Sequence, residues 1–401
     1  MNGAKTERAK IRQRLTLFVL LWLSGACLRL TVLAIPPVVP LLHADLHLSE
    51  TGIGWLSSLP PMLFAIAAVP GALIIARFGL VPALLVALSL TAAGSALRGA
   101  VANVVFLYAS TIAMGAGVAI AQTVMPPLVR SWFPQRIGLA TTIYTNGLLI
   151  GEILPVGLTI PLVLPLVHDS WRLDLVFWSL PVLATALFVA ACAPRADTAK
   201  APAPAKRRWW PDWRNSIIWR LGLILGSVNS IYFVSNAFLP DFVIARGRPD
   251  LVSSALTAIN IGQLPATFLL LGFADRLLRR PSTYCVTGLA TFLCLVAMMS
   301  MDGWWIVFWA GMEGFTNAVT LILALALPSI LSAADDVHRT TAGMFTISYS
   351  CAMAFSVLGG WLWDLTHLPI AGFAPVAVCA LVVVALSSTV KHAAIQPATA
   401  R

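Results

Sequence analysis

The sequence predicts an all-α membrane protein of twelve transmembrane helices, arranged as two six-helix bundles. Of its 401 residues, 59% are hydrophobic and only 10% are charged, a balance that soluble domains of this length do not show. Apolar stretches long enough to cross a bilayer recur twelve times between charged or proline- and glycine-rich breaks. One long basic connection separates the first six stretches from the last six.

The first apolar stretch, residues 15–42, contains one charge, Arg29. At about 1.5 Å per residue, Arg29 lies about 20 Å along the helix from Leu15, near the middle of a hydrocarbon core about 30 Å thick. A charge at that depth costs about 2.5 to 3.5 kcal/mol on insertion scales and normally faces a bundle interior, a watered cavity or an acidic partner. The sequence therefore predicts a protein built around a polar centre.

The other expected helices follow the same hydropathy pattern. With the first, they span residues 15–42, 51–76, 80–101, 104–129, 137–166, 174–193, 216–240, 252–274, 282–301, 304–331, 340–363 and 369–390. The connection of residues 194–215 is rich in alanine, proline and basic residues, as expected of a flexible linker. We therefore expect an N-terminal bundle in residues 1–193 and a C-terminal bundle in residues 216–401.

The distribution of lysine and arginine predicts the orientation. Twenty-one of these residues lie on the side of the expected helices that carries the N-terminus, and Arg29 lies within the membrane. The other side holds only Arg98, Arg172, Arg246 and Arg248. Because cytoplasmic loops carry the excess of basic residues, we expect both termini and the linker in the cytoplasm and the chain in the inner membrane.

Composition and motifs also bear on other classes of function. The net charge of +10 comes from short basic clusters between apolar stretches, which topology explains better than nucleic-acid binding does. The six cysteines lack CxxC and CxxH spacing, so we expect neither disulfides nor a metal site, and no cofactor. No HExxH, GxSxG or P-loop pattern favours an enzyme, and no repeated selectivity filter favours a channel.

Weak internal repeats accompany the division into six and six helices. Three pairs of motifs recur at an offset near 200 residues, to within one or two residues. They are Ala76-Arg77 and Asp275-Arg276, Pro127 and Pro328, and Thr141 and Thr341. Such a repeat predicts two similar halves.

The segment Gly272–Arg280 resembles the cytoplasmic loop signature of the major facilitator superfamily. The glycine that usually follows the acid-arginine pair is Leu278 here. The N-terminal copy, residues 71–79, has Ala76 at the acidic position. The resemblance implies the superfamily's fold, in which two six-helix bundles are related by pseudo-two-fold symmetry.

The same resemblance implies gating residues. In the superfamily the acid and arginine of this loop lock the inner gate, which assigns that role here to Asp275 and Arg276. In the N-terminal copy only Arg77 remains, so that copy is expected to gate without a charge pair.

Further short motifs resemble the branch of the superfamily that transports cyanate and 2-nitroimidazole, over most of the chain. They are Leu28-Arg29 with Pro36-Pro37, Leu59-Pro60, Gly115–Pro127 with Trp132-Phe133-Pro134, Ile143-Tyr144-Thr145, and Phe238-Leu239-Pro240 with Arg246-Gly247. One departure is Glu313-Gly314, where glutamine before glycine is expected in that branch.

The superfamily lines its central cavity with helices 1, 4, 7 and 10, helped by helices 2, 5, 8 and 11. Arg29 is therefore expected to bind the substrate or set the electrostatics of the cavity, and the alternative is a structural ion pair. Gln122 and Tyr144 are further substrate-binding candidates on the fourth and fifth helices.

Two acidic residues inside the expected helices, Glu152 and Glu313, are candidates for proton coupling. A buried carboxylate near a cation can bind and release a proton, although a structural pair or hydrogen bond would also explain it. Glu313, Asn317 and Thr320 share one helical face that is too polar for lipid. Asn317 is accordingly expected to contact the substrate.

The seventh helix carries a polar and aromatic stripe suited to a small solute. The stripe consists of Asn229, Tyr232, Phe233 and Asn236, of which we expect Asn229, Tyr232 and Asn236 to bind substrate. Gln263 and Asn260 are similar candidates on the eighth helix. The alternative for all of them is hydrogen bonding between helices, which membrane bundles use routinely.

These residues favour a transporter that moves a small solute by alternating access. Arg29 favours an organic or inorganic anion, because a basic side chain in a cavity of low dielectric attracts negative charge. Coupling to protons is left open. The alternatives are an exporter of a nitroimidazole-like or other drug and an uncoupled uniporter. The chain is expected to work as a monomer in the lipid bilayer.

Overall fold

The computed structural model describes residues 2–47, 50–194 and 208–388, and these residues form helices and connecting turns without any strand. Eleven helices among them are long and apolar enough to cross a membrane. A bent pair of helices raises the number to as many as twelve. The predicted all-α membrane fold of twelve helices is confirmed.

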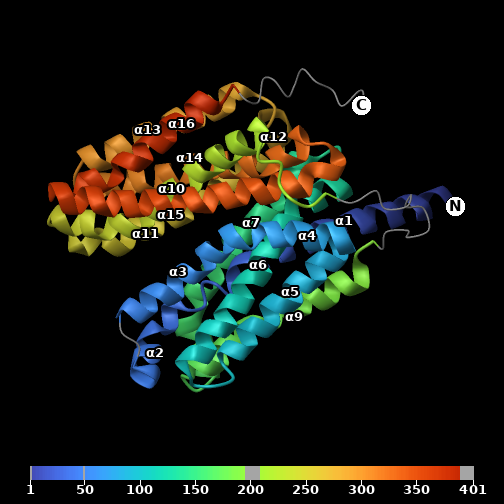
Figure 1. The fold of residues 1–401 in the computed structure, drawn as a ribbon, viewed down its shortest axis with the longest axis horizontal. Coiled ribbons are helices and arrows are strands. Elements are labelled where there is room, and N and C mark those ends of the chain that lie inside the picture. The colour runs from blue at the N-terminus through green and yellow to red at the C-terminus, as the bar shows by residue number, and fades with distance from the viewer. Residues whose placement is uncertain (1, 48–49, 195–207, 389–401) are drawn as a thin grey trace. The chain divides into compact units, whose positions relative to one another are not determined.

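Figure 1 shows the helices in chain order from blue to red. They are α1 (Asn2–Leu30), α2 (Val39–Leu46), α3 (Glu50–Ile66), α4 (Ala68–Phe78), α5 (Leu80–Arg98), α6 (Val104–Trp132), α7 (Ile137–Leu158), α8 (Leu164–Leu166), α9 (Trp171–Cys192), α10 (Ser216–Ala245), α11 (Val252–Ile261), α12 (Gln263–Leu277), α13 (Pro281–Ser300), α14 (Trp304–Leu331), α15 (Val337–Thr366) and α16 (Ala374–Leu386).

The chain divides into two compact units. The first contains Met1–Pro134 and Ile143–Trp210, and the second contains Gln135–Thr142 and Pro211–Arg401. In the first, α5 packs against α6 and α9; in the second, α10 packs against α15 and α16. The predicted bundle boundaries stay a prediction, because most of the predicted linker, residues 195–207, lies outside the described residues.

The first expected helix is broken rather than continuous, so the prediction of one helix over residues 15–42 is wrong in that respect. Helix α1 ends at Leu30, a 3₁₀ turn follows at Pro36–Val38, and α2 begins at Val39. Proline has no backbone N–H and its ring clashes with the preceding turn. Pro36 and Pro37 therefore prevent the hydrogen bonds that would carry the helix forward.

Three other expected helices are interrupted for a similar reason. Helices α3 and α4 meet at a bend of 50°, three residues before Pro70, and α11 gives way to α12 at Gly262, three residues before Pro265. A π-helical segment, Thr159–Val163, follows α7 and contains Pro161. In each case the proline cannot donate a hydrogen bond to the carbonyl four residues earlier.

A GxxxG motif, Gly147 to Gly151, lets α7 approach α1 very closely. A Cβ atom added to Gly147 would lie 2.1 Å from the Trp22 carbonyl oxygen, and one added to Gly151 would lie 2.2 Å from the Ala26 carbonyl oxygen. Small residues at this spacing allow helix backbones in membranes to pack in direct contact. Beside them, Trp22 Nε1 donates a hydrogen bond to Asn146 Oδ1 at 2.9 Å.

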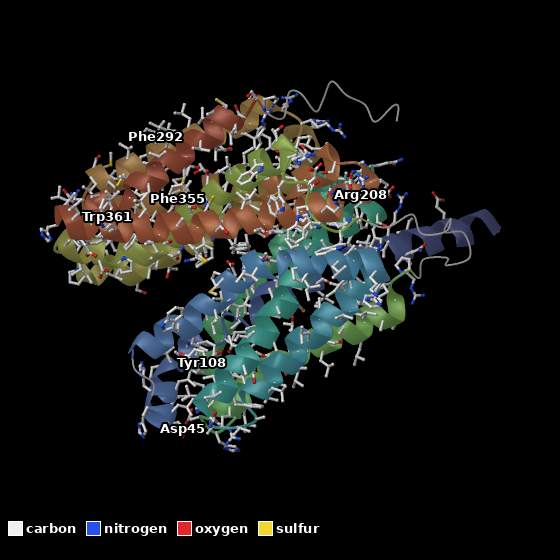
Figure 2. The ribbon with its side chains drawn as sticks, in the orientation of Figure 1. Asp45, Tyr108, Arg208, Phe292, Phe355 and Trp361 are labelled. Atoms are coloured by element: carbon white, nitrogen blue, oxygen red, sulfur yellow. The ribbon has the colours of Figure 1, made fainter. Side chains whose placement is uncertain are left out.

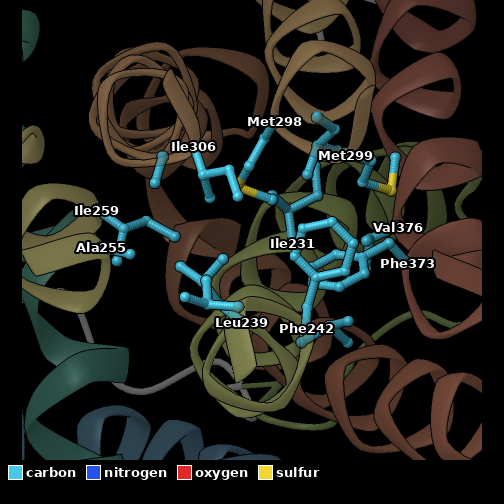
Figure 3. Packing of buried hydrophobic residues seen from close by; sticks show 14 of the residues in the cluster. Ile231, Leu239, Phe242, Ala255, Ile259, Met298, Met299, Ile306, Phe373 and Val376 are labelled. Atoms are coloured by element: carbon cyan, nitrogen blue, oxygen red, sulfur yellow. The ribbon is translucent and has the colours of Figure 1, made fainter. Parts of the chain in front are cut away.

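Each unit has its own buried core. In the second unit, Figure 3 shows large apolar side chains from several helices meeting around Ile231, Leu239 and Phe242 of α10. In the first unit, Leu42 and Trp171 belong to the core that lies near α2. Asp45, labelled in Figure 2, fixes this region because it accepts a hydrogen bond from Trp171 Nε1 at 2.9 Å.

We predict that Gly151→Ala lowers the stability of the protein, by about 1 to 3 kcal/mol, because the added methyl group overlaps the Ala26 carbonyl. The melting temperature in detergent measures this change. Gly157→Ala on the same helix is the control, since a Cβ there meets no atom within 4 Å. Equal melting temperatures for the two variants would contradict the close contact.

Candidate functional site

Arg29 occupies the last turn of α1, at the edge of the helix break. The end of a helix that exposes carbonyl groups carries partial negative charge, which favours a cation. Arg29 Nε donates a hydrogen bond to Glu152 Oε1 of α7 at 3.0 Å. The ring of Phe64 from α3 lies 5.3 Å from the guanidinium carbon, a distance typical of a cation–π interaction.

The Arg29–Glu152 pair is partly accessible. The side chain of Arg29 is 14% exposed and that of Glu152 is 11% exposed. As an ion pair the two residues carry no net charge between them, and each side chain keeps a small exposed surface. The GxxxG motif explains why the carboxylate reaches Arg29, because Glu152 directly follows Gly151.

Tyr144 and Gln122 belong to the same unit as this pair. Tyr144 of α7 is 2% exposed and Gln122 of α6 is 5% exposed. The backbone of Tyr144 also lies against α1, since a Cβ added to Gly25 would be 2.0 Å from the Tyr144 carbonyl oxygen. Both predicted residues are therefore interior residues of the first unit.

The second unit buries a carboxylate that has no cationic partner within the described part of the chain. Glu313 of α14 is 1% exposed, and neither of its carboxylate oxygens has a hydrogen-bond partner among the described residues. Ser235 of α10 and Cys294 of α13 lie near it. The adjacent Gly314 lets α11 approach, because a Cβ there would lie 2.1 Å from the Ile259 carbonyl oxygen.

The face that Glu313 shares with Thr320 joins α14 to two other helices, α13 and α10. Thr320 donates a hydrogen bond to Thr287 Oγ1 of α13 at 2.8 Å. One turn away, Thr291 donates to Thr316 Oγ1 at 2.9 Å. Asn317 Nδ2 donates to the Val228 carbonyl of α10 at 3.1 Å. Polar groups therefore follow Glu313 along α14 toward the end of that helix.

The predicted stripe on α10 is engaged in a hydrogen-bond network. Tyr232 Oη donates to Asn260 Oδ1 of α11 at 3.0 Å, and Asn260 Nδ2 donates to Asn236 Oδ1 at 2.9 Å. Asn229 Nδ2 donates to Ser348 Oγ of α15 at 2.8 Å. These bonds have the form of the alternative considered above, hydrogen bonding between helices, and substrate binding by these residues stays a prediction.

The other predicted residues lie at helix ends. Gln263 is buried at the start of α12, directly after the break at Gly262. Asp275 of α12 accepts a hydrogen bond from the Gly138 backbone N–H at 2.7 Å. Arg276 and Arg77 are both exposed and lie in the last turns of α12 and α4, the equivalent places that the repeat predicted.

Sequence reasoning missed several residues. The charge pattern predicts Arg98 outside the membrane, yet it is fully buried, as is Asp174. Phe64 and Ser235 carry no sequence signal that separates them from ordinary core residues. The GxxxG motif is visible in the sequence and indicates that α7 packs closely against another helix, though not that this helix is α1. Among the residues that the structure describes, no group of three His, Cys, Asp or Glu side chains could hold a metal ion.

The chain is similar in sequence to a known family of proteins and to transporters within it. Residues 21–249 match the family model of the Major Facilitator Superfamily. The 2-nitroimidazole transporter of Escherichia coli K12 is 24% identical over 360 residues, which cover 88% of this chain and 89% of that protein. The cyanate transport protein CynX of the same organism is 26% identical over 269 residues, which cover 66% and 68%.

A solved structure has the same fold. The proton:xylose symporter XylE superposes with a TM-score of 0.76, covering 93% of this chain and 95% of that chain at 13% identity. Identity this low shows a common fold and carries no information about the substrate.

We predict that Arg29 and Glu152 stabilise the first unit as a pair. Removing one partner strands a buried charge, so Arg29→Met and Glu152→Met should each lower the free energy of unfolding by about 3 kcal/mol. The double variant should lose much less than the sum, because neither charge remains. Unfolding in detergent measures all four proteins, and additive losses would contradict the coupling.

Proposed function

Because the chain belongs to the Major Facilitator Superfamily, we propose that it is a secondary active transporter that moves a small organic or inorganic anion across the membrane by alternating access. It is a multi-pass membrane protein. We place it in the inner membrane with both termini in the cytoplasm, on the strength of its basic-residue asymmetry and its bacterial relatives.

The observation that carries the proposal is the ion pair of Arg29 and Glu152. A guanidinium group offers five N–H donors in a planar fork, of which Nε is bound to Glu152. The exposed part of the side chain can grip an oxyanion or a similar small anion with charge-assisted hydrogen bonds. The ring of Phe64 covers part of the guanidinium and favours a flat ligand beside it.

Glu152 gives the site a route to proton coupling. An anion that binds Arg29 has to compete with the carboxylate for the same guanidinium. A proton on Glu152 removes the competing charge, so anion and proton bind together and cross together. Without the proton, the pair closes again once the anion has left.

Glu313 is the second proposed proton site. An ionised carboxylate buried without a partner carries a large desolvation cost, and binding a proton removes the charge. Glutamine, the residue expected here in the resembling branch, could only form hydrogen bonds. The carboxylate therefore gives this chain a chemical step that an amide lacks.

The remaining candidate residues have proposed supporting roles. We assign contacts with the solute to the residues whose polar side chains line the two interiors: Gln122, Tyr144, Asn229, Tyr232, Asn236, Gln263 and Asn317. We assign gating to Asp275, Arg276 and Arg77. The hydrogen bond from Gly138 N–H to Asp275 supports this role, because breaking it would free the end of α12.

A nitroimidazole-like drug is the second candidate substrate. It is favoured by the likeness to the 2-nitroimidazole transporter and by Phe64, which can stack on a flat heterocycle. For such a neutral solute Arg29 contributes less, since the solute brings no charge to the pair.

We predict that Arg29→Lys and Arg29→Ala abolish or severely weaken anion binding in a protein that still folds and inserts. Lysine keeps the charge but lacks the planar fork of donors. A thermal-shift screen of cyanate, small carboxylates and 2-nitroimidazole on purified protein measures binding, because a ligand of the folded state raises its melting temperature. Arg220→Ala, a change at an exposed arginine, is the control.

The same screen separates the two substrates. Anion binding to Arg29→Ala as tight as to the parent would remove Arg29 from the site. Stabilisation of both proteins by 2-nitroimidazole, with no response of the parent to any anion, would favour the drug transporter.

We predict that Glu313→Gln retains substrate exchange but loses acceleration by a pH gradient, because exchange needs no net proton movement. Proteoliposomes loaded with the ligand found by thermal shift test this. Asp302→Asn, at an acid whose side chain is 76% exposed, is the matched control.

Transport by Glu313→Gln that still follows the imposed gradient excludes Glu313 as the proton site and leaves Glu152→Gln as the next variant to test. An unchanged pH response in both would indicate an uncoupled uniporter.

A further inference from the structure

Arg98 binds the chain where helix one breaks. It is the last residue of α5 and is fully buried. Its Nη2 atom donates a hydrogen bond to the Thr31 carbonyl at 2.7 Å and another to Ser95 Oγ at 2.9 Å. Thr31 directly follows the end of α1 and stands two residues after Arg29. The guanidinium thus replaces a backbone donor that a continuous helix would have supplied.

The surroundings hold Arg98 in place. Ser95 Oγ also donates to the Leu175 carbonyl of α9 at 3.2 Å, which ties α5 to α9 at this level. Asp174, in the first turn of α9, is fully buried, and its negative charge interacts with the positive charge of Arg98. The end of α1, the end of α5 and the start of α9 are therefore joined through two side chains, Arg98 and Ser95.

Burying Arg98 and Asp174 costs folding free energy, so stability by itself does not explain the pair. The Nε and Nη1 atoms of Arg98 and both carboxylate oxygens of Asp174 have no hydrogen-bond partner within the described part of the chain. Apolar residues of similar volume often stabilise a protein as much as a buried ion pair or more. What apolar residues cannot supply is a donor for the Thr31 carbonyl.

We propose that Arg98 is a positioning residue, which fixes the broken end of helix one and thereby sets the place of Arg29. The proposal rests on the substrate-binding role of Arg29 for its effect on transport, whereas its effect on the helix break is independent of any substrate. Asp174 serves as the fixed counter-charge that allows Arg98 to be buried.

The test compares charge-balanced variants by hydrogen–deuterium exchange of the purified protein. Arg98→Met/Asp174→Leu removes both charges, so no buried charge is stranded and the fold is retained. We expect faster exchange of the amides of residues 31–38 and anion binding weaker by about tenfold. Exchange in α14, which contains Glu313, should stay as in the parent and serves as the internal control.

Arg98→Lys is the conservative variant. Its ammonium group can still donate to the Thr31 carbonyl, so we expect exchange and binding between those of the parent and the double variant. This partial rescue distinguishes positioning from a general loss of packing, and it gives a second measurement should the double variant unfold.

Parental exchange at residues 31–38 in the double variant would overturn the proposal, as would exchange in Arg98→Lys as fast as in the double variant. A failure of the transport hypothesis gives a different result. If Arg29→Ala still binds anions while the double variant loosens residues 31–38, Arg98 fixes the break but Arg29 is not the substrate residue.

Discussion

The polar centre of the first unit depends on the break in helix one. Helix α1 ends at Leu30 in the interior of the bundle, and Pro36 and Pro37, which follow it, cannot donate backbone bonds to the carbonyls of Val32 and Leu33. Carbonyl groups at a helix end carry partial negative charge and attract cations. Arg29 lies in that last turn, and Arg98 binds the carbonyl directly beyond it. Two guanidinium groups thus serve one helix end.

Each of these cations has an acidic neighbour from another helix, and the two pairs differ in a way that suits different tasks. Arg29 and Glu152 are in direct contact and each keeps more than a tenth of its side chain exposed. This exposure agrees with the proposed role of Arg29 and Glu152 in binding a solute and a proton. Arg98 and Asp174 are fully buried. Nothing from outside competes for them, and the Thr31 carbonyl stays bound.

Hydropathy predicted where the chain crosses the membrane, because the bilayer imposes length and apolarity on every crossing. It did not predict where the helices break. Pro126 and Pro127 lie inside the unbroken helix α6, whereas Pro36 and Pro37 end α1, so packing decides what a proline pair does. Hydropathy also could not predict which charged residues form ion pairs. Arg29 and Glu152 are 123 residues apart in sequence, and only the contact of α1 with α7 brings them together.

The four basic residues predicted on the side away from the termini show what the charge count leaves out. All are arginines, and each is bound: Arg98 to Thr31, Arg172 to the Gly99 carbonyl at 3.0 Å, Arg246 to Asp302 at 2.7 Å and Arg248 to Asp250 at 2.7 Å. The topology rule concerns basic residues that stay in the loops near the cytoplasmic surface. Arginines that bind carbonyls and carboxylates at helix ends stabilise the fold instead. Arg339, counted on the predicted cytoplasmic side, is engaged in the same way, because it pairs with Asp336 at 2.5 Å. An ion pair by itself therefore does not distinguish the two sides.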